Sequence, residues 1–361
     1  MSAAPSSSRP LVTYFASSNR GRGIYVATLD TSTGQLTETG GNDIPGRGWL
    51  ALSPDERFLY AAIDGDAIAS FAVDQQTGQL TALNTAPTGT SSVSHLSVDP
   101  SGKYVIGASY SGGAVCVVAI NADGSLGQPT DVLKHEGEVP GPHPDQTQAK
   151  AHQCPWDLSG KWVVVNDLGL DRTYVYSLDT DTGQLIPNDP PFIQFARGRG
   201  PRHIAFHPSN KFAYVINELS AEMTALTWDA EHGVFKELNT LTTLPEGWTG
   251  RKWTAQVIVH PNGKFVYGSN RGSGTESDAI AIYAIDQETG RISPAGHAQT
   301  LGQVARNFNI EPSGKYLVCA HQDSDNVVVF SIDGETGALT PTGPQLTITN
   351  AVCTVFAPSI G

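Results

Sequence analysis

The 361-residue chain has only 16% charged residues but 38 glycines and 23 prolines, a turn-rich composition typical of all-β proteins with many short strands. Its net charge of −13 argues against nucleic-acid and acidic-membrane partners, which need clustered Lys and Arg, but permits a small anionic ligand held by a few local arginines. The sequence lacks both a run of 18 apolar residues and an apolar leader segment, so we expect no association with a membrane.

The N-terminal segment and the cysteines carry further information about the chain. We expect residues 1–10, rich in Ser and Pro, to form a disordered tail before a single domain over residues 11–361. Four cysteines stand at positions 116, 154, 319 and 353 among mostly apolar neighbours, without a Cys-x-x-Cys spacing. We therefore expect buried free thiols and a reducing, cytoplasmic location.

A tight turn of the form x-Pro-Ser-Gly-Lys, followed by an apolar strand, recurs along the chain. Proline presets φ early in such a turn, and Gly or Asn tolerates the left-handed position late in it. The copies, some of them degenerate, number six and occupy residues 53–57, 99–103, 157–161, 207–211, 260–264 and 311–315. Each copy predicts a hairpin.

A second turn of the form Thr-Gly-x-Leu follows another β-rich run in every period. This turn or a degenerate form of it occurs seven times, with its glycine at positions 34, 78, 124, 183, 233, 290 and 337, which are 44 to 59 residues apart. One period therefore contains four short strands and two hairpin turns. A repeat of this length and content is the signature of a β-propeller blade.

We predict an all-β fold, a seven-bladed β-propeller with four-stranded antiparallel blades. Seven copies of the second turn against six of the first indicate that one blade is divided between the termini. The strand at Leu11–Phe15 is expected to pair with one near Cys353–Phe356, which closes the ring and removes open sheet edges. Rings of six or eight blades are the alternatives.

Both tight turns of a blade must lie on one face of the disc, so the irregular connections lie on the other. Two long connections, over residues 134–151 and 243–254, are expected on that second face, where long loops are frequently functional. We expect His135 and His143 to be solvent-exposed residues of the first loop, and His207 and His260 to be structural residues of the tight turns.

Polar residues recur at equivalent places on the irregular face, at the entry to the first strand and the exit from the second strand of each blade. They should surround the mouth of the central channel, the usual ligand location on a closed β scaffold. The candidates are His95, His152, Arg202, His203, Glu218, Arg271, Arg306 and His321, with Asp167 and Gln256 at matching positions.

Three arginines that converge on one mouth suit a carboxylate or a phosphate. His152 or Glu218 could act as general acid or base, whereas no Gly-x-Ser-x-Gly nucleophile and no His-Glu-x-x-His metal motif is present, so we expect no metal and no cofactor. A structural reading stands beside the functional one: Arg202 and Glu218 could simply pair across their hairpin, and a His at a strand entry is more often a packing residue than a catalyst.

The chain resembles the seven-bladed propeller lactonase family, which includes propeller-type 6-phosphogluconolactonases and 3-carboxy-cis,cis-muconate cycloisomerase. The most specific matches are Gly-Pro-Arg-His at 200–203, Asn-Glu-Leu at 217–219, Ser-Asn-Arg-Gly at 269–272 and the segments 167–172 and 306–315. The resemblance implies an active-site group of His152, Arg202, Glu218 and Arg271, with the lactonase branch as the better match.

The resulting hypothesis is a lactone hydrolase whose partner is a small anionic sugar-acid lactone. Substrate contacts are assigned to His95, His203, Arg306, His321, Asp167 and Gln256. Two alternatives remain: an isomerase of the carboxymuconate cycloisomerase type, which would use the same acid–base group without adding water, and a non-catalytic propeller scaffold. The sequence leaves the oligomeric state open.

Overall fold

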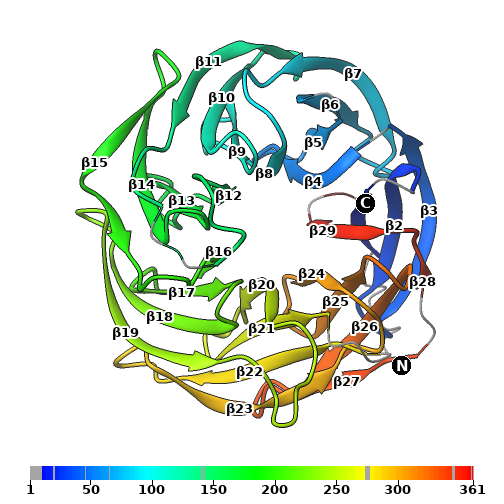
Figure 1. Ribbon diagram of the computed structural model, residues 1–361. Helices are drawn as coiled ribbons and strands as arrows, with labels where there is room; N and C mark the ends of the chain where they lie inside the picture. The colour runs from blue at the N-terminus through cyan, green and yellow to red at the C-terminus, as the bar shows by residue number, and fades with distance from the viewer. Residues whose placement is uncertain are drawn as a thin grey trace.

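The computed structural model describes residues 10–18, 21–44, 46–64, 66–139, 141, 143–272, 277–343, 346–358 and 360. In these residues the strands form seven antiparallel sheets, arranged as the blades of a propeller around a central axis (Figure 1). The fold prediction is therefore confirmed. Of the tail predicted over residues 1–10, residues 1–9 lie outside the described part of the chain.

Each blade begins with its innermost strand. The first four blades are β29 (Ala351–Ala357), β1 (Leu11–Ser17), β2 (Gly23–Asp30) and β3 (Gln35–Asp43); β4 (Gly46–Leu52), β5 (Phe58–Ile63), β6 (Ala67–Val73) and β7 (Leu80–Pro87); β8 (Val93–Val98), β9 (Tyr104–Ser109), β10 (Ala114–Ile120) and β11 (Leu126–Lys134); and β12 (Ala151–Gln153), β13 (Val163–Asp167), β14 (Arg172–Asp179) and β15 (Gln184–Gln194).

The remaining blades follow the same order. They are β16 (Pro201–Phe206), β17 (Phe212–Asn217), β18 (Glu222–Asp229) and β19 (Val234–Thr242); β20 (Trp253–Val259), β21 (Phe265–Arg271), β22 (Ala279–Ile285) and β23 (Ile292–Gln299); and β24 (Ala305–Ile310), β25 (Tyr316–His321) and β26 (Asn326–Ile332), whose outer edge pairs with both β27 (Leu339–Pro341) and β28 (Leu346–Thr347).

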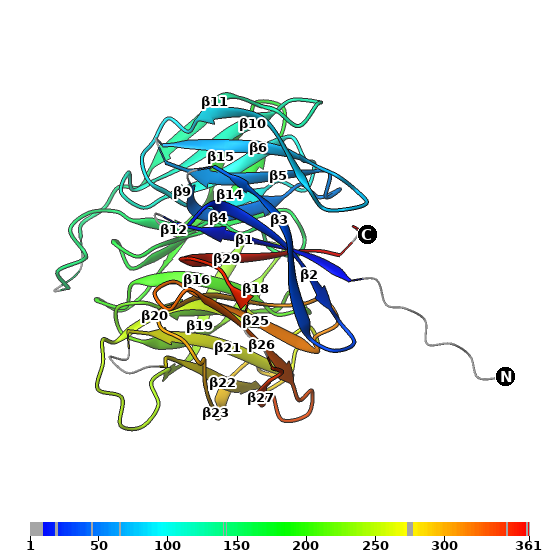
Figure 2. The ribbon, with the colours of Figure 1, turned by 90° about the vertical axis from the view of Figure 1, so that its right-hand side faces the viewer.

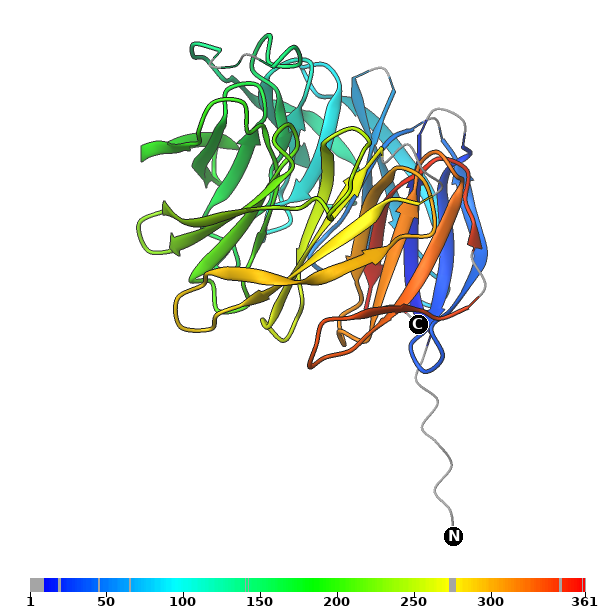
Figure 3. The same ribbon diagram turned by 60° about the horizontal axis from the view of Figure 1, so that its bottom comes forward.

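The ring closes where the sequence predicts. The C-terminal strand β29 pairs with β1, with Tyr14 opposite Val355 and Phe15 opposite Thr354, so the first blade contains both ends of the chain. Figure 3 shows these blue and red strands side by side. This pairing completes the first blade, and the inner strand of each blade keeps one short, unpaired edge that the ring protects.

The repeated turns recur because they join neighbouring blades. A tyrosine of the second strand donates its hydroxyl hydrogen bond to the carbonyl of the Thr-Gly turn in the next blade: Tyr14 to Gly78 at 2.8 Å, Tyr214 to Gly290 at 3.1 Å. A turn histidine makes an equivalent contact with the first tight turn of the next blade. His207 Nε2 lies 3.1 Å from the Gly263 carbonyl oxygen, which supports its structural reading.

The cores lie between adjacent sheets and are apolar, as the alternation in the strands predicts. One such core packs Ile216 and Met223 of one blade against Val257 and Tyr283 of the next. All four cysteines are free and buried, as expected. The described residues contain no helix of the length and apolarity that a membrane crossing requires.

The two long loops extend from the same face of the disc, opposite the tight turns (Figure 2). The expectation that His135 is solvent-exposed is wrong. Its side chain is fully buried, bonded to Asp167 at 2.6 Å from Nδ1 to Oδ2, and stacked on Tyr174 with ring centroids 4.0 Å apart. The first loop is thus anchored into the fourth blade by a buried polar pair that a lone loop histidine does not reveal.

Candidate active site

Irregularities in strand pairing aim the candidate side chains at the centre of the ring. In four inner strands one extra residue interrupts the register against the second strand: Ser94, His152, Arg202 and Arg306. A β-bulge of this kind bends the strand and re-aims a side chain. All four of these residues line one cavity of about 500 Å³.

The exits of the second strands supply the remaining charged groups. Glu218 follows β17 directly, and Arg271 is the last residue of β21. Both line the same cavity as His152, Arg202 and Arg306. The structure therefore brings together the four residues predicted as catalytic, together with the predicted substrate contact Arg306.

One carboxylate holds two arginines. Glu218 Oε2 lies 2.7 Å from Arg202 Nε and Glu218 Oε1 lies 2.7 Å from Arg271 Nη2. The Nε–H bond of Arg202 does not point straight at its oxygen, so the first contact is an ion pair rather than a well-aligned hydrogen bond. Arg202 also donates to the Ala255 carbonyl at 2.6 Å, and Arg271 donates to the Thr254 carbonyl at 3.1 Å. Arginines from adjacent blades are thereby fixed in one arrangement.

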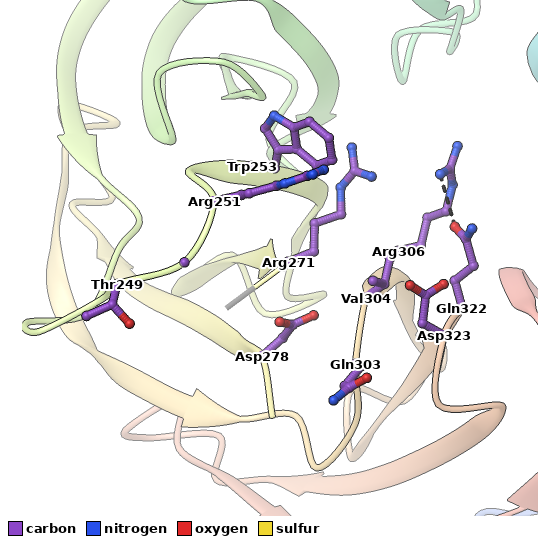
Figure 4. Close-up of a pocket in the computed structure, with 12 residues that line it drawn as sticks. Thr249, Arg251, Trp253, Arg271, Asp278, Gln303, Val304, Arg306, Gln322 and Asp323 are labelled. Atoms are coloured by element: carbon purple, nitrogen blue, oxygen red, sulfur yellow. Dashed lines mark hydrogen bonds between the residues drawn. The ribbon is translucent and has the colours of Figure 1, made fainter. Parts of the chain in front are cut away.

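The third arginine has no such partner. Arg306 donates to the Gln322 side-chain oxygen at 3.0 Å (Figure 4). None of the ion pairs between described residues includes Arg306. The cavity wall therefore contains three guanidinium groups and two carboxylates, Glu218 and Asp145, and among the described residues only Glu218 pairs with these arginines. Taking a charge out of water is costly unless an opposite charge meets it, so this excess of positive charge favours an anionic ligand.

The pKa values follow from this arrangement. Burial raises the pKa of Glu218, but the charges of Arg271, Arg202 and Arg306 outweigh burial, and the net pKa lies below its ordinary value. Burial lowers the pKa of Arg202 to about 9 against the opposing effect of Glu218. Burial together with the charge of Arg271 lowers the pKa of Arg306 to about 10. At neutral pH the carboxylate and both guanidinium groups are charged.

The imidazole of His152 is neutral and largely unbonded. Its Nδ1 is buried with no hydrogen-bond partner among the described residues, and its ring meets the Tyr110 ring edge-on at 5.6 Å. Burial and then the charge of Arg202 hold the pKa of His152 well below 6.5. A neutral imidazole in a cavity wall is able to accept a proton from a water molecule.

A second layer of polar residues supports the cavity from beneath. Arg202 Nη1 donates to His203 Nε2 at 3.1 Å, and His203 Nδ1 in turn donates to the Gln256 side-chain oxygen at 2.5 Å. His95 stacks on Trp49 with ring centroids 4.3 Å apart. These predicted substrate contacts, His95, His203 and Gln256, lie outside the cavity lining. His95 and His203 each follow the bulged position in their strand, and Gln256 lies within the register shift of β20.

The last two predicted substrate contacts lie inside blades. Asp167 is fully buried, where it bonds His135 and accepts the backbone N–H of Lys150 at 2.8 Å. His321 is fully buried too and its Nδ1 donates to the Asn326 carbonyl at 3.1 Å. The structure does not bring either side chain to the cavity.

Several lining residues were not among the candidates. Tyr110 and Gln322 occupy strand-exit positions equivalent to Glu218, but they are uncharged and therefore give a weaker sequence signal for a site. Asp145 comes from a long loop whose path the sequence leaves open. Trp253 borders both this cavity and a second one of about 930 Å³. Figure 4 shows that second cavity, with Arg251 stacked at 4.6 Å on the Trp253 ring. Arg271 and Arg306 lie at the junction of the two.

The fold and the site together define a class: a β-propeller with an arginine-rich cavity between the inner strands of its blades. Within the described ranges, no three His, Cys, Asp or Glu side chains converge as the ligands of a metal ion would. The profile of the family described as lactonase, 7-bladed beta-propeller, matches residues 11–356. The chain belongs to this family.

Proteins similar to this chain include named enzymes of known sequence and proteins of solved structure. It is 33% identical over 313 residues to the 6-phosphogluconolactonase of Bacillus subtilis, a match that covers 83% of this chain and 84% of that protein. It is 32% identical to the 6-phosphogluconolactonase of Pectobacterium carotovorum, over 83% and 87% of the two chains. The structure of the Pseudomonas aeruginosa periplasmic gluconolactonase superimposes with a TM-score of 0.86 at 25% identity, covering 96% of this chain and 99% of that one.

Proposed function

We propose that this protein hydrolyses the lactone of an anionic sugar acid, with a 6-phosphogluconolactone as the foremost substrate. The observation that carries the proposal is the cavity in which three arginines face only two carboxylates, Glu218 and Asp145, beside the neutral imidazole of His152. The names of the relatives support the same chemistry. A compact anion placed in this cavity would neutralise the excess positive charge.

In the proposed reaction His152 takes a proton from a water molecule as that water attacks the lactone carbonyl carbon. A C–O bond forms to the water oxygen, and the carbonyl oxygen gains negative charge that Arg202 and Arg271 stabilise. The ring C–O bond then breaks, the leaving ring oxygen takes the proton from His152, and the product is the open-chain acid. No group beyond the side chains of the chain and one water molecule enters this balance.

Glu218 is assigned an electrostatic role. Its lowered pKa keeps it ionised at neutral pH, so it is suited to hold Arg202 and Arg271 in place rather than to give up a proton. This narrows its predicted acid–base role to orientation of the arginines that meet the substrate.

The test measures acid release from 6-phosphogluconolactone and from uncharged aldonolactones at pH 7, above the spontaneous rate. We expect the phosphorylated lactone to be preferred, His152→Ala to lower kcat at least 100-fold, and exposed His232→Ala to leave it unchanged. Activity should survive dialysis against EDTA. If wild type and His152→Ala are both indistinguishable from buffer across the panel, the lactonase proposal fails.

The product distinguishes hydrolysis from isomerisation. Mass spectrometry in H₂¹⁸O should detect one ¹⁸O atom and a mass gain of one water in the product. A product of the same mass as the substrate would instead favour the cycloisomerase alternative.

We also propose a cytoplasmic location, supported by four buried cysteines that remain free thiols. Fractionation of cells that express the full chain tests it: recovery in a periplasmic or secreted fraction would contradict the proposal.

A further inference from the structure

In most blades a repeated contact joins the two irregular connections on the cavity face. One residue between the second and third strands accepts, through its backbone carbonyl, the N–H that follows the fourth strand. In the described residues six blades show this contact, and the accepting residues are Asp66, Gly113, Asp171, Ala221, Asp278 and Asp325.

Where this residue is aspartate, its carboxylate makes a second contact with the backbone that leads into the next blade. Asp66 accepts the N–H of Ser92 at 2.8 Å, Asp278 that of Ala305 at 3.0 Å and Asp325 that of Asn350 at 2.8 Å. The two blades that carry Gly113 and Ala221 instead are followed by the two long loops. The carboxylate therefore fixes a short connection between blades by a hydrogen bond to its backbone, and we call such an aspartate a latch.

Asp171 holds the connection that leads to Arg202. It is fully buried, and it accepts two backbone N–H groups, from Gly198 at 2.8 Å and from Gly200 at 2.7 Å. The Gly200 carbonyl then accepts the N–H of Glu218 at 2.8 Å. The Gly200 residue thus links Asp171 to the backbone of both Arg202, two residues on, and Glu218.

We propose that Asp171 is a positioning residue that fixes the connection carrying Arg202 against the strand exit carrying Glu218. This inference rests on the proposed function for its catalytic consequence. Arg202 occupies a bulge, where strand pairing constrains the backbone less than in a regular ladder, so the connection before it needs a separate anchor. A buried carboxylate that accepts two N–H groups supplies that anchor.

The test compares Asp171→Asn with Asp325→Asn, the same latch in a blade whose connection leads to β29 and to none of the proposed catalytic residues. The amide keeps one acceptor oxygen but turns an NH₂ donor toward a backbone N–H. We expect kcat/KM for 6-phosphogluconolactone to fall about 10- to 100-fold in Asp171→Asn, as small misplacements of catalytic groups do, and less than 3-fold in Asp325→Asn.

A second readout does not depend on activity. His203 Nε2 accepts from Arg202, so the ¹⁵N resonances of the His203 ring report the position of that guanidinium. We expect them to shift in Asp171→Asn and to stay in place in Asp325→Asn. Equal effects of the two variants, or unmoved His203 resonances in Asp171→Asn, would overturn the inference.

A failure of the proposed function and a failure of the Asp171 inference give different results. Wild-type protein without lactonase activity would refute the proposed function, while the His203 resonances would still decide the role of Asp171. Should Asp171→Asn fail to fold, Asp171→Ser, which retains an oxygen acceptor, is measured against the same control, and unshifted resonances there likewise overturn the inference.

Discussion

At the scale of single residues, Glu218 carries the most consequential charge in the cavity. It separates two guanidinium groups that would otherwise repel each other in a buried position. Glu218→Gln removes that charge while preserving shape. We expect kcat/KM to fall at least 100-fold and the free energy of unfolding to fall by about 3–5 kcal/mol, the cost of leaving a buried charge without its partner.

Activity assays and urea unfolding check this prediction, with Glu237→Gln as the matched control. Glu237 also pairs with an arginine, Arg199 at 2.9 Å, but its side chain is 37% exposed. Such surface pairs contribute less than about 1 kcal/mol. Similar losses of unfolding free energy in the two variants would contradict the larger contribution that we expect from the buried Glu218 ion pairs.

At the scale of elements, the β16–β17 hairpin places the entry to one strand beside the exit from the next. The close approach occurs at Gly200, whose φ is +62° and where an added Cβ would lie 2.5 Å from Leu219 Cγ. Gly200→Ala must therefore both strain the backbone and push the hairpin ends apart. We expect lower kcat/KM and a stability loss beyond the roughly 1–2 kcal/mol of left-handed backbone strain.

Gly247→Ala isolates the strain from the crowding. Gly247 has a φ of +78°, but an added Cβ there would meet nothing within 4 Å. Thermal or urea unfolding of the two variants measures the difference. If Gly200→Ala is no less stable than Gly247→Ala and is fully active, the hairpin contact does not determine the site geometry.

At the scale of the whole molecule, the closed ring buries four histidines in neutral form. Burial lowers the pKa of His95 to about 3 and of His321 to about 4, and holds those of His152 and His203 well below 6.5. The unfolded chain binds protons at these sites once the pH falls below 6.5, whereas the folded chain does not. Folding stability must therefore decrease as pH falls from 6.5 toward the folded pKa values.

Each such histidine contributes about 1.4 kcal/mol per pH unit in that window. Urea unfolding at pH 7.5, 6.0 and 5.0 checks the slope. The carboxylates with lowered pKa, such as Glu218, titrate below this window. His321→Gln should reduce the slope of unfolding free energy against pH by the contribution of one histidine, and it leaves the cavity unchanged. A urea midpoint that stays constant from pH 7.5 to 5.0 would contradict the burial of these histidines in neutral form.

Periodicity in the chain was enough to predict the propeller, the seven blades and the pairing of the two termini. Repeated turns report local backbone chemistry, which tolerates few residues at each position, and equal spacing implies equal place in the blade. The same phase argument predicted that Glu218 and Arg271 would share an edge with Arg202. It could not predict that His135 is buried with Asp167, since that contact joins a long loop to another blade.

The choice between neighbouring residues was made only by the tertiary structure. At the entry to each inner strand the repeat phase picks out two neighbouring residues, and alternation along the strand sends only one of them toward the cavity. The pairs are His152 and Gln153, Arg202 and His203, and Arg306 and Asn307. The bulge adds one residue against the partner strand, and this shift in the alternation decides which of the two neighbours faces the cavity. That parity depends on the register between strands, which no single strand contains. For this reason the spacing of the repeats located the rim of the channel but did not separate Arg202, which faces the cavity, from His203, which lies beneath it.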